Sequence, residues 1–254
     1  TPHGSKTAAR LQKARPARPA GRRRRRAARP TDSRTGPRVG WGAEPKTFER
    51  VPIPNPSHRN ERAARLPARL SRSWLLTSAA NEDSFEPNYE SEADSIILDL
   101  EDGTPADQKD SARERVVRAL NSGMRAWVRV NAITTDQWSE DLAALSEAEG
   151  LRGIVLAETE QPDHITRTAM MSRAGTPVIG LIESAVGLVN AVDIAKAPGT
   201  FRLAFGTGDF RKDTGISDDP TAMAHARSTL VIASRVGNLP GPIDGPANGV
   251  DEAG

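Results

Sequence analysis

From residue 72 onward, short apolar runs alternate with segments of helical periodicity at a spacing of about 25 residues. We expect strands at Trp74–Thr77, Ser95–Leu100, Ala126–Val130, Gly153–Leu156, Val178–Ile182 and Arg202–Phe205, with Ile243 as a candidate seventh. Strand followed by helix, repeated, is typical of βα units that build a parallel sheet.

Helices are expected between these strands. The clearest runs from Pro105 to Asn121, with Thr104 as its N-cap and Gly123 just past its end. Others are predicted at about 136–147, from Glu183 to the Pro198-Gly199 stop, and at 221–235. The residues at helical spacing expected to pack inward are Ala112, Val116, Val117, Leu120, Trp138, Leu142, Leu145, Val186, Leu188, Val189, Val192 and Ile194.

The glycine pattern argues against a dinucleotide-binding open sheet. Such a sheet needs a Gly-rich turn after its first strand, yet Ser78-Ala-Ala-Asn81 stands there. Gly206 and Gly208 are followed by Arg211 where a third glycine would be required, and the sequence has no Gly-x-x-x-x-Gly-Lys phosphate loop. We therefore predict a TIM-type (β/α)8 barrel, apparently truncated before its eighth strand.

Charge divides the chain into two unlike pieces. Residues 1–72 carry a net charge of +16 and the remainder −14. We predict a disordered Arg/Pro/Ala-rich arm over 1–70, a partial barrel domain over 71–246 and a tail over 247–254. The arm contains the run Arg22–Arg26, which would attract anionic polymers. It lacks interleaved aromatic residues, so a nucleic-acid partner is not expected; a transit peptide is disfavoured by its prolines.

Cysteine is absent, which leaves only oxygen and imidazole ligands for a metal. The four histidines, His3, His58, His164 and His225, have no paired spacing of the kind that binds zinc. No run reaches the ~20 apolar residues of a membrane span, and the N-terminal region lacks a signal-peptide core. A cytoplasmic protein with hard-cation chemistry is expected.

Two of the predicted strands stop at a carboxylate. Gly180-Leu-Ile-Glu-Ser184 ends at Glu183, and Phe205-Gly-Thr-Gly-Asp209 ends at Asp209. Arg129 lies near the end of Ala126–Val130, where it would face the same rim of a barrel. Two carboxylates suit a divalent cation with oxygen ligands, and a guanidinium suits an anionic substrate beside it.

Six motifs together resemble the citrate lyase β-subunit-like branch of the HpcH/HpaI aldolase/citrate lyase family. They are Arg72-Ser-Trp-Leu75, Ile97-Leu-Asp-Leu-Glu-Asp102, Trp127-Val-Arg-Val-Asn131, Leu181-Ile-Glu-Ser184 with Gly187-Leu188, Phe205-Gly-Thr-Gly-Asp209 and Pro242-Ile-Asp-Gly245. The resemblance covers about residues 72–245 and implies a Mg²⁺-dependent barrel enzyme.

The resemblance also implies roles for individual residues. Glu183 and Asp209 are expected to bind Mg²⁺, Glu183 also meeting substrate, and Arg129 to clamp a substrate carboxylate. Glu101 and Asp102 are expected to orient metal-bound water and neighbouring basic groups; capping of the following helix is the alternative for both. Arg72 is expected to face substrate or a coenzyme phosphate, with a surface position as the alternative.

The implied reaction is retro-Claisen cleavage of a 3-hydroxyacyl-CoA, such as citryl-, malyl- or citramalyl-CoA, to a 2-oxo acid and an acyl-CoA. Thioester hydrolysis or condensation would use the same groups. The resemblance further implies a homo-oligomer, a trimer or hexamer, with a small-molecule acyl-CoA or 2-oxo acid as partner.

Two departures from the family pattern weaken the implied activity: Ala157-Glu158 replaces a Pro-Lys pair, and Ser78-Ala79 replaces Pro-Gly. The alternative is a catalytically incompetent relative that binds metal or ligand, with its basic arm contacting anionic polymers.

Overall fold

The structure is a computed structural model that describes residues 66–246. The predicted arm up to residue 65 and the predicted tail at 247–254 lie outside the described residues. Residues 66–70, also assigned to the arm, are described and include a short 3-10 helix, η1 (Ala68–Leu70). The strands are β1 (Trp74–Ser78), β2 (Ser95–Asp99), β3 (Ala126–Val130), β4 (Leu151–Leu156), β5 (Val178–Ile182) and β6 (Thr200–Phe205).

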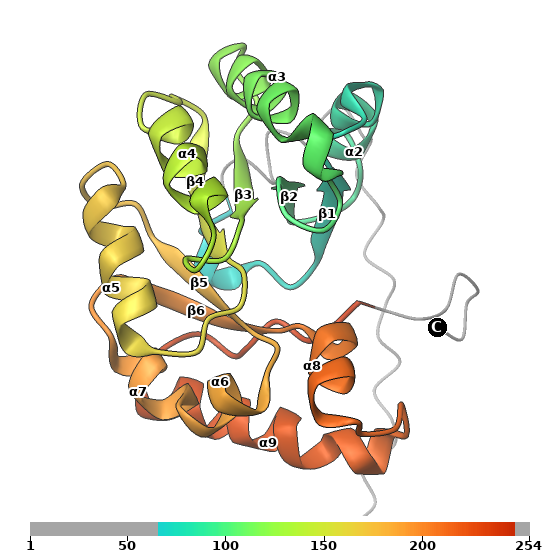
Figure 1. Ribbon diagram of the computed structural model, residues 1–254, viewed down its shortest axis with the longest axis vertical. Helices are drawn as coiled ribbons and strands as arrows, with labels where there is room; N and C mark the ends of the chain where they lie inside the picture. Colours follow the sequence, from blue (N-terminus) through green and yellow to red (C-terminus); the bar gives the residue numbers. More distant parts are fainter. Residues whose placement is uncertain (1–65, 247–254) are drawn as a thin grey trace, which may run out of the picture. The chain divides into compact units, whose positions relative to one another are not determined.

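The sheet order separates a barrel from a dinucleotide-binding fold. All neighbouring strands pair in parallel, and their order in the sheet, β1 to β6, is their order in the chain. A doubly wound sheet would instead reverse its strand order at a switch point. Figure 1 shows the strands inside an arc of helices. The described residues therefore form a six-stranded parallel half-barrel, in which the parallel sheet of βα units is as predicted and the number of strands is smaller.

The candidate seventh strand is reduced to a single residue. Ile243 forms an isolated parallel bridge with Ala204, in which its N–H donates to Leu203 O at 2.9 Å and its carbonyl accepts from Phe205 N at 2.9 Å. Pro242 stands immediately before it in the sequence, and Pro246 follows three residues later. Because proline has no N–H to give to a ladder, pairing does not extend. Within residues 66–246 the predicted eight-stranded barrel is thus a sheet of six strands.

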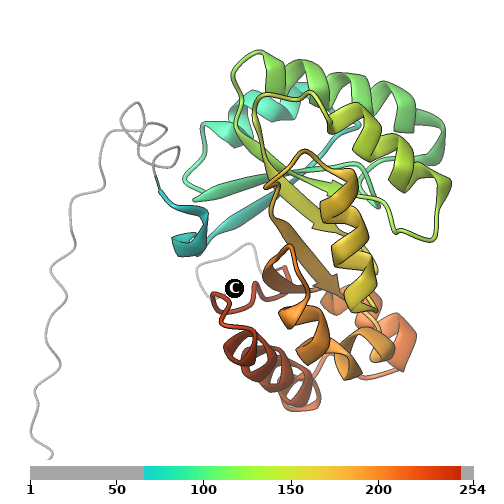
Figure 2. The same ribbon diagram turned by 90° about the vertical axis from the view of Figure 1, so that its left-hand side faces the viewer.

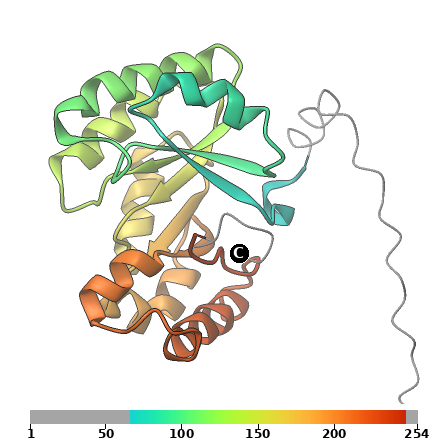
Figure 3. The same ribbon diagram turned by 90° about the vertical axis from the view of Figure 1, so that its right-hand side faces the viewer.

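Helices lie on the outer side of the sheet, in the order of the chain (Figures 1, 2 and 3). The α-helices are α2 (Phe85–Tyr89), α3 (Lys109–Asn121), α4 (Asp136–Leu145), α5 (Pro162–Met171), α6 (Ala185–Val189), α7 (Ala191–Lys196), α8 (Thr207–Thr214) and α9 (Pro220–Val236). Two further 3-10 helices are η2 (Glu82–Ser84) and η3 (Ala106–Gln108). None of the helices in the described part is long and apolar enough to cross a membrane.

Alternation along the strands sends side chains to two separate apolar clusters. The larger cluster fills the space between sheet and helices and contains Leu98, Val128, Ile154, Ile182 and Leu203 among others. The smaller one faces the inside of the curve and consists of Ile97, Trp127, Val155, Ile179, Leu181 and Ala204, with Trp74, Phe201, Ile243 and Ala68 packed against it. Functional groups on the inner face therefore start from a rigid, apolar floor.

Two helix predictions need correction. Thr104 does not cap a helix at Pro105: its hydroxyl donates to Asp99 O at 2.7 Å, and α3 begins only at Lys109, after η3. The single helix predicted after Glu183 is two short ones, α6 and α7. The break leaves Val189 83% exposed, so it does not pack inward as its spacing suggested.

Arg202 joins the two ends of the open sheet on its inner side. From β6 its Nε donates to Gly241 O at 2.6 Å, and its Nη1 donates to Ser71 O, just before β1, at 2.8 Å. Its guanidinium also lies 5.5 Å from the ring of Trp74, within the range of a cation–π contact. Burial lowers the pKa of Arg202. A single buried side chain thus connects the first strand, the last strand and the segment leading to Ile243.

Candidate active site

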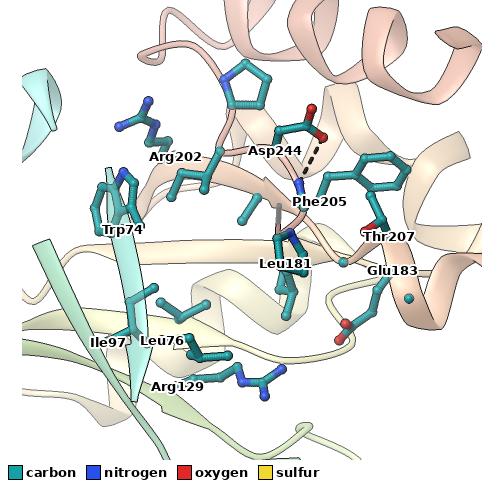
Figure 4. Close-up of a pocket in the computed structure, with 18 of the residues that line it drawn as sticks. Trp74, Leu76, Ile97, Arg129, Leu181, Glu183, Arg202, Phe205, Thr207 and Asp244 are labelled. Atoms are coloured by element: carbon teal, nitrogen blue, oxygen red, sulfur yellow. Dashed lines mark hydrogen bonds between the residues drawn. The ribbon is translucent and has the colours of Figure 1, made fainter. Parts of the chain in front are cut away.

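A cavity of about 620 Å³ runs along the inner face of the sheet, and the candidate site is the part of it at the carboxyl ends of the strands (Figure 4). Barrel enzymes carry their reactive groups at this end of the strands. Apolar side chains of the inner cluster form its floor, and charged groups stand around it. The residues lining it include Arg72, Trp74, Leu76, Ile97, Arg129, Val155, Leu181, Glu183, Arg202, Ala204, Gly206, Thr207, Asp209 and Ile243.

Asp99 and Arg129 form a buried two-point ion pair between β2 and β3. Nε of Arg129 donates to Oδ1 at 2.7 Å and Nη2 donates to Oδ2 at 2.6 Å. Asp99 also accepts the backbone N–H groups of Glu101 and Gly103, at 3.0 and 2.8 Å. A Cβ on Gly103 would lie 2.4 Å from Asp99 Oδ2, so only glycine permits this turn. Four donors therefore satisfy a fully buried carboxylate.

Arg129 was predicted to clamp a substrate carboxylate. Of the five N–H groups of a guanidinium, Asp99 takes two, and Nη1 lies 2.9 Å from Glu101 Oε2. Figure 4 shows the guanidinium pointing toward the part of the cavity that Glu183 also enters. The carboxylates of Asp99 and Glu101 keep the pKa of Arg129 above its ordinary value despite its burial. Its planar group is thus held in one orientation at the wall of the cavity.

Glu101 lies beyond the end of β2, in the turn that Asp99 holds. Burial raises its pKa to about 7, although Arg129 opposes the rise. A carboxyl group with a pKa near neutrality can both accept and release a proton at working pH. Asp102, its neighbour, is exposed, and no side-chain bond from it caps α3. The capping alternative is therefore not seen for either residue.

Glu183 follows β5 immediately and points into the cavity. It is 94% buried, and its Oε1 accepts the backbone N–H of Glu158 at 2.7 Å. Burial raises its pKa to about 7, with the carboxylates of Glu101 and Asp209 adding to the rise and Arg129 opposing it. Gly206 makes room for it, because a Cβ there would stand 2.4 Å from Glu183 Oε2. The glycine of the Phe-Gly-Thr-Gly-Asp motif is thus required by the carboxylate on the neighbouring strand.

Asp209 does not end a strand, as the sequence suggested. β6 stops at Phe205, and Asp209 lies in the first turn of α8, where the helix dipole favours a negative charge. Its Oδ1 accepts from Nζ of Lys212 at 2.7 Å, one turn along the same helix. The Gly-Thr-Gly stretch, predicted to be the end of a strand, contains the start of α8. Asp209 still lines the same cavity as Glu183.

A second cavity, of about 450 Å³, shares Glu183 and Asp209 with the first. Its lining carries seven carboxylates against one lysine: Glu101, Asp102, Glu158, Glu160, Glu183, Asp209 and Asp213, with Lys212. Such an excess of like charge makes each added carboxylate costly to ionise unless a cation joins it. Two of these carboxylates, Glu158 and Glu160, come from the loop that follows β4. The sequence analysis had noted Glu158 but not Glu160.

The donor set fits Mg²⁺. Residues 66–246 contain no group of three or more His, Asp or Glu side chains arranged to hold a metal ion. Mg²⁺ does not require one, because it keeps several waters and takes one or two protein carboxylates. Glu183 has an oxygen, Oε2, for which the structure gives no protein donor, and Asp209 is near enough to raise its pKa. These two residues are the ones that would hold the ion.

The structure brings Arg72 to the cavity, at the end opposite Glu183. It is exposed and lines the pocket next to Trp74, while its backbone N–H donates to Asp94 Oδ2 at 2.8 Å. Its predicted contact with substrate or phosphate stays a prediction. Asp102 faces the acidic cavity rather than the apolar one.

Sequence reasoning missed Lys109 as a part of the site's framework. Lys109, the first residue of α3, donates from Nζ to Leu100 O at 2.6 Å, Glu101 O at 2.8 Å and Asn131 Oδ1 at 2.7 Å. Asn131 in turn donates to Asp141 Oδ2 at 2.7 Å from its amide. The signal that could have found Lys109 is a cation near the N-terminus of a predicted helix, where the dipole disfavours it.

The fold and the site together define a class: a parallel (β/α) barrel-type protein with an acidic, arginine-flanked cavity at the carboxyl ends of its strands. The model of the HpcH/HpaI aldolase/citrate lyase family matches residues 72–240, which are more than half of the chain. The chain belongs to the HpcH/HpaI aldolase/citrate lyase family.

Curated relatives carry citrate lyase and thioesterase names. A citrate lyase subunit beta-like protein of Mycobacterium tuberculosis is 31% identical over 168 residues, which are 63% of this chain and 59% of that protein. A (3S)-malyl-CoA thioesterase of Cereibacter sphaeroides is 30% identical over 174 residues, 66% of this chain and 60% of that protein. The match thus spans about three fifths of the length of these relatives.

Solved structures of the family share the fold. CitE from Mycobacterium tuberculosis, in complex with magnesium, acetoacetate and coenzyme A, superposes with a TM-score of 0.61 at 28% identity, over 72% of this chain and 68% of that chain. RipC from Yersinia pestis superposes with a TM-score of 0.62 at 32% identity, over 73% and 80%. Mg²⁺ is therefore a ligand within this family.

Proposed function

We propose that this chain is a Mg²⁺-dependent carbon–carbon lyase that cleaves a 3-hydroxyacyl-CoA to a 2-oxo acid and an acyl-CoA. One observation carries the proposal: Arg129, held by Asp99, faces the same cavity as Glu183 and Asp209. A cation-binding pair and an anion-binding group within one apolar-floored cavity match the chemistry of a hydroxy-acid thioester. The magnesium, coenzyme A and acetoacetate in the related CitE structure support the ligand class.

Each residue has a distinct task in this proposal. Arg129 binds the carboxylate that becomes part of the 2-oxo acid, with the two N–H groups that Asp99 and Glu101 leave free. Glu101, whose pKa is about 7, takes the proton of the 3-hydroxyl as the carbon–carbon bond breaks. Asp102 stands beside Glu101 and raises its pKa by like-charge repulsion.

Mg²⁺, when bound by Glu183 and Asp209, supplies Lewis acidity toward the substrate oxygens and stabilises developing negative charge. The cleavage leaves an acyl-thioester enolate, whose carbon takes up the proton that Glu101 accepted from the hydroxyl, which gives the acyl-CoA and restores the Glu101 carboxylate. The apolar floor formed by Ile97, Val155 and Leu181 keeps bulk water from competing for the enolate. Arg72, at the far end of the cavity, would meet the coenzyme end of the substrate.

One observation favours the alternative, a family relative that binds metal or ligand without cleaving it. Glu158 is exposed at the acidic cavity with a positive φ of 46°, and it adds a negative charge where an anionic substrate would approach. In that case the cavity would still hold Mg²⁺, and the added negative charge of Glu158 would repel an anionic thioester.

The deciding experiment incubates the purified chain with citryl-, malyl- and citramalyl-CoA, in Mg²⁺ or in chelator. A 2-oxo acid without free thiol identifies a lyase, and free thiol without a 2-oxo acid identifies a thioesterase. Neither product, together with Mg²⁺ binding by calorimetry, would favour the incompetent relative. Light scattering of the same sample tests the homo-oligomer that the family resemblance implies.

Substitution of the proposed ligands tests the metal site. Glu183→Gln and Asp209→Asn should each abolish Mg²⁺ binding measured by calorimetry. Glu149→Gln is the matched control, because Glu149 is exposed in the loop before β4, at the opposite end of the strands. Unchanged affinity in both ligand variants would contradict the assignment.

A further inference from the structure

Lys109 occupies a position that disfavours its charge. It is the first residue of α3, where the unpaired N–H groups and the dipole repel a cation. Burial lowers its pKa as well, although Glu101, Asp141, Asp99 and Asp102 counteract the effect. A residue that breaks a local rule in this way is expected to serve a site rather than the stability of its helix.

The three donors of its ammonium group are all used. Two go to the backbone carbonyls of Leu100 and Glu101, at 2.6 and 2.8 Å, and the third goes to Asn131 Oδ1 at 2.7 Å. An ammonium group has three N–H donors, so none remains for a substrate. Lys109 therefore acts on the chain around Glu101 and not on a ligand.

The acceptor side of this contact is rigid. The Asn131 amide also donates to Leu100 O at 3.1 Å and to Asp141 Oδ2 at 2.7 Å. The other oxygen of Asp141 accepts from Nε of Arg113 at 2.7 Å, and both of these side chains are buried. Helices α3 and α4 thus hold the lysine's target in place from outside the sheet.

Two independent sets of bonds fix the turn that carries Glu101. Asp99 binds its N–H groups, at Glu101 and Gly103, while Lys109 binds its carbonyls, at Leu100 and Glu101. With both backbone edges occupied, the side chain of Glu101 is left to project toward Arg129. Without Lys109, Leu100 O would keep the Asn131 amide at 3.1 Å and Glu101 O would keep the N–H of Thr104 at 3.0 Å, but the group that ties both carbonyls to α3 would be lost.

We propose that Lys109 is a positioning residue, which fixes the Leu100–Glu101 backbone and thereby holds the Glu101 carboxylate against Arg129. The catalytic consequence rests on the proposed function, in which Glu101 moves the proton of the substrate hydroxyl. The structural consequence, order in the 100–104 turn, is independent of any reaction.

The first test measures backbone order by hydrogen exchange of the full-length chain. In Lys109→Met, the backbone amides of residues 100–104 should exchange at least tenfold faster, while those of β5 keep their protection. Lys196→Met is the matched control, because Lys196 is exposed at the end of α7. Unchanged exchange at 100–104 in a folded Lys109→Met protein would overturn the proposal.

The second test is a double-mutant cycle on 2-oxo acid release with Mg²⁺. Lys109→Met should lower kcat at least tenfold with KM within twofold, and should change kcat less than twofold in a Glu101→Gln background. An equal loss in both backgrounds would show that Lys109 acts independently of Glu101 and would overturn the proposal. If Lys109→Met does not fold, Lys109→Gln, which keeps two of the three donors, enters both tests.

The two proposals fail separately. If no thioester is cleaved by the unsubstituted chain, the proposed function fails, and the exchange result alone decides whether Lys109 orders the turn. If cleavage is observed but the turn is as ordered in Lys109→Met as in the unsubstituted chain, only the positioning role fails.

Discussion

The two sides of the cavity handle charge in opposite ways. On the β2–β3 side, Asp99, Arg129 and Lys109 have charged or polar partners for nearly every donor and acceptor. On the β5–α8 side, Glu183 is buried with one backbone N–H for a partner, and Asp209 has only the exposed Lys212. On the first side, called the β2–β3 wall below, the charged groups are already paired with one another. On the second side the carboxylates lack the positive charge that a bound cation would supply.

The difference shows which charges serve the fold and which serve a ligand. Removing one partner of a buried ion pair is strongly destabilising, because the other charge is left buried and uncompensated. A buried carboxylate with no cation is costly to keep, and is maintained where function needs it. Removing the buried carboxylate charge of Asp99 should therefore lower the stability, whereas removing that of Glu183 should raise it.

The largest effect is expected at Asp99. Asp99→Ala leaves the buried guanidinium of Arg129 without its two-point partner and frees two backbone N–H groups. We expect the free energy of unfolding, measured by urea titration, to fall by about 3–5 kcal/mol. Glu149→Ala, at an exposed loop position, should leave it unchanged. A loss as small as that of Glu149→Ala would mean that the β2–β3 wall is not a structural unit.

A smaller loss is expected at Gly206, on the opposite side. Gly206→Ala would place a Cβ 2.4 Å from Glu183 Oε2 and 2.6 Å from Glu183 Cβ. Displacing the glutamate should cost about 1–3 kcal/mol and weaken Mg²⁺ binding. Gly208→Ala is the matched control, because a Cβ there meets nothing within 4 Å. Equal behaviour of the two variants would contradict the close contact between Gly206 and Glu183.

Glu183→Gln should have the opposite sign. The pKa of Glu183 is raised from 4.5 to about 7, so the folded state binds the extra proton between these pH values. The free energy of unfolding in chelator should therefore fall as pH rises from about 4.5 to 7 and level off above. At pH 8, Glu183→Gln should raise it by about 1 kcal/mol or more, whereas at pH 4 the two proteins should be alike. Destabilisation at pH 8 would refute the idea of an uncompensated charge.

The smallest effect is expected at Lys212, which competes with a metal for Asp209. Lys212→Met removes an exposed pair at 2.7 Å, and exposed pairs are weak. Mg²⁺ affinity should rise, by at most about fivefold, in calorimetry at pH 8. Lys196→Met serves as the control. A fall in affinity would indicate that Lys212 supports the site rather than competing for it.

The strands were predictable because each is rich in apolar residues, and β2, β3 and β5 are buried along their whole length. Ala126–Val130 and Val178–Ile182 were predicted with the bounds that the structure has. The position of Glu183 followed from the end of its strand. Asp209 was placed on a strand end rather than in α8, because Gly-Thr-Gly carries no helical periodicity before Phe210 packs inward.

The partners of the charged residues could not be predicted. Asp99 and Arg129 meet because β2 and β3 pair them directly in register, and register is fixed by packing that one sequence does not reveal. Lys109 binds backbone carbonyls, and because every residue has one, the sequence does not indicate which of them a lysine will contact. The candidate ligands were thus foreseen by residue type, while the framework that orients them had to be seen.

Arg202 has a consequence for how the chain folds. Its bond to Ser71 O joins residues 131 positions apart, so it can form only after the whole series of βα units has been assembled. We expect this contact to arise late and to be among the first lost when the protein opens locally. The Arg202 guanidinium thus connects the segment before β1 with β6, so the folding of the two ends of the sheet is coupled.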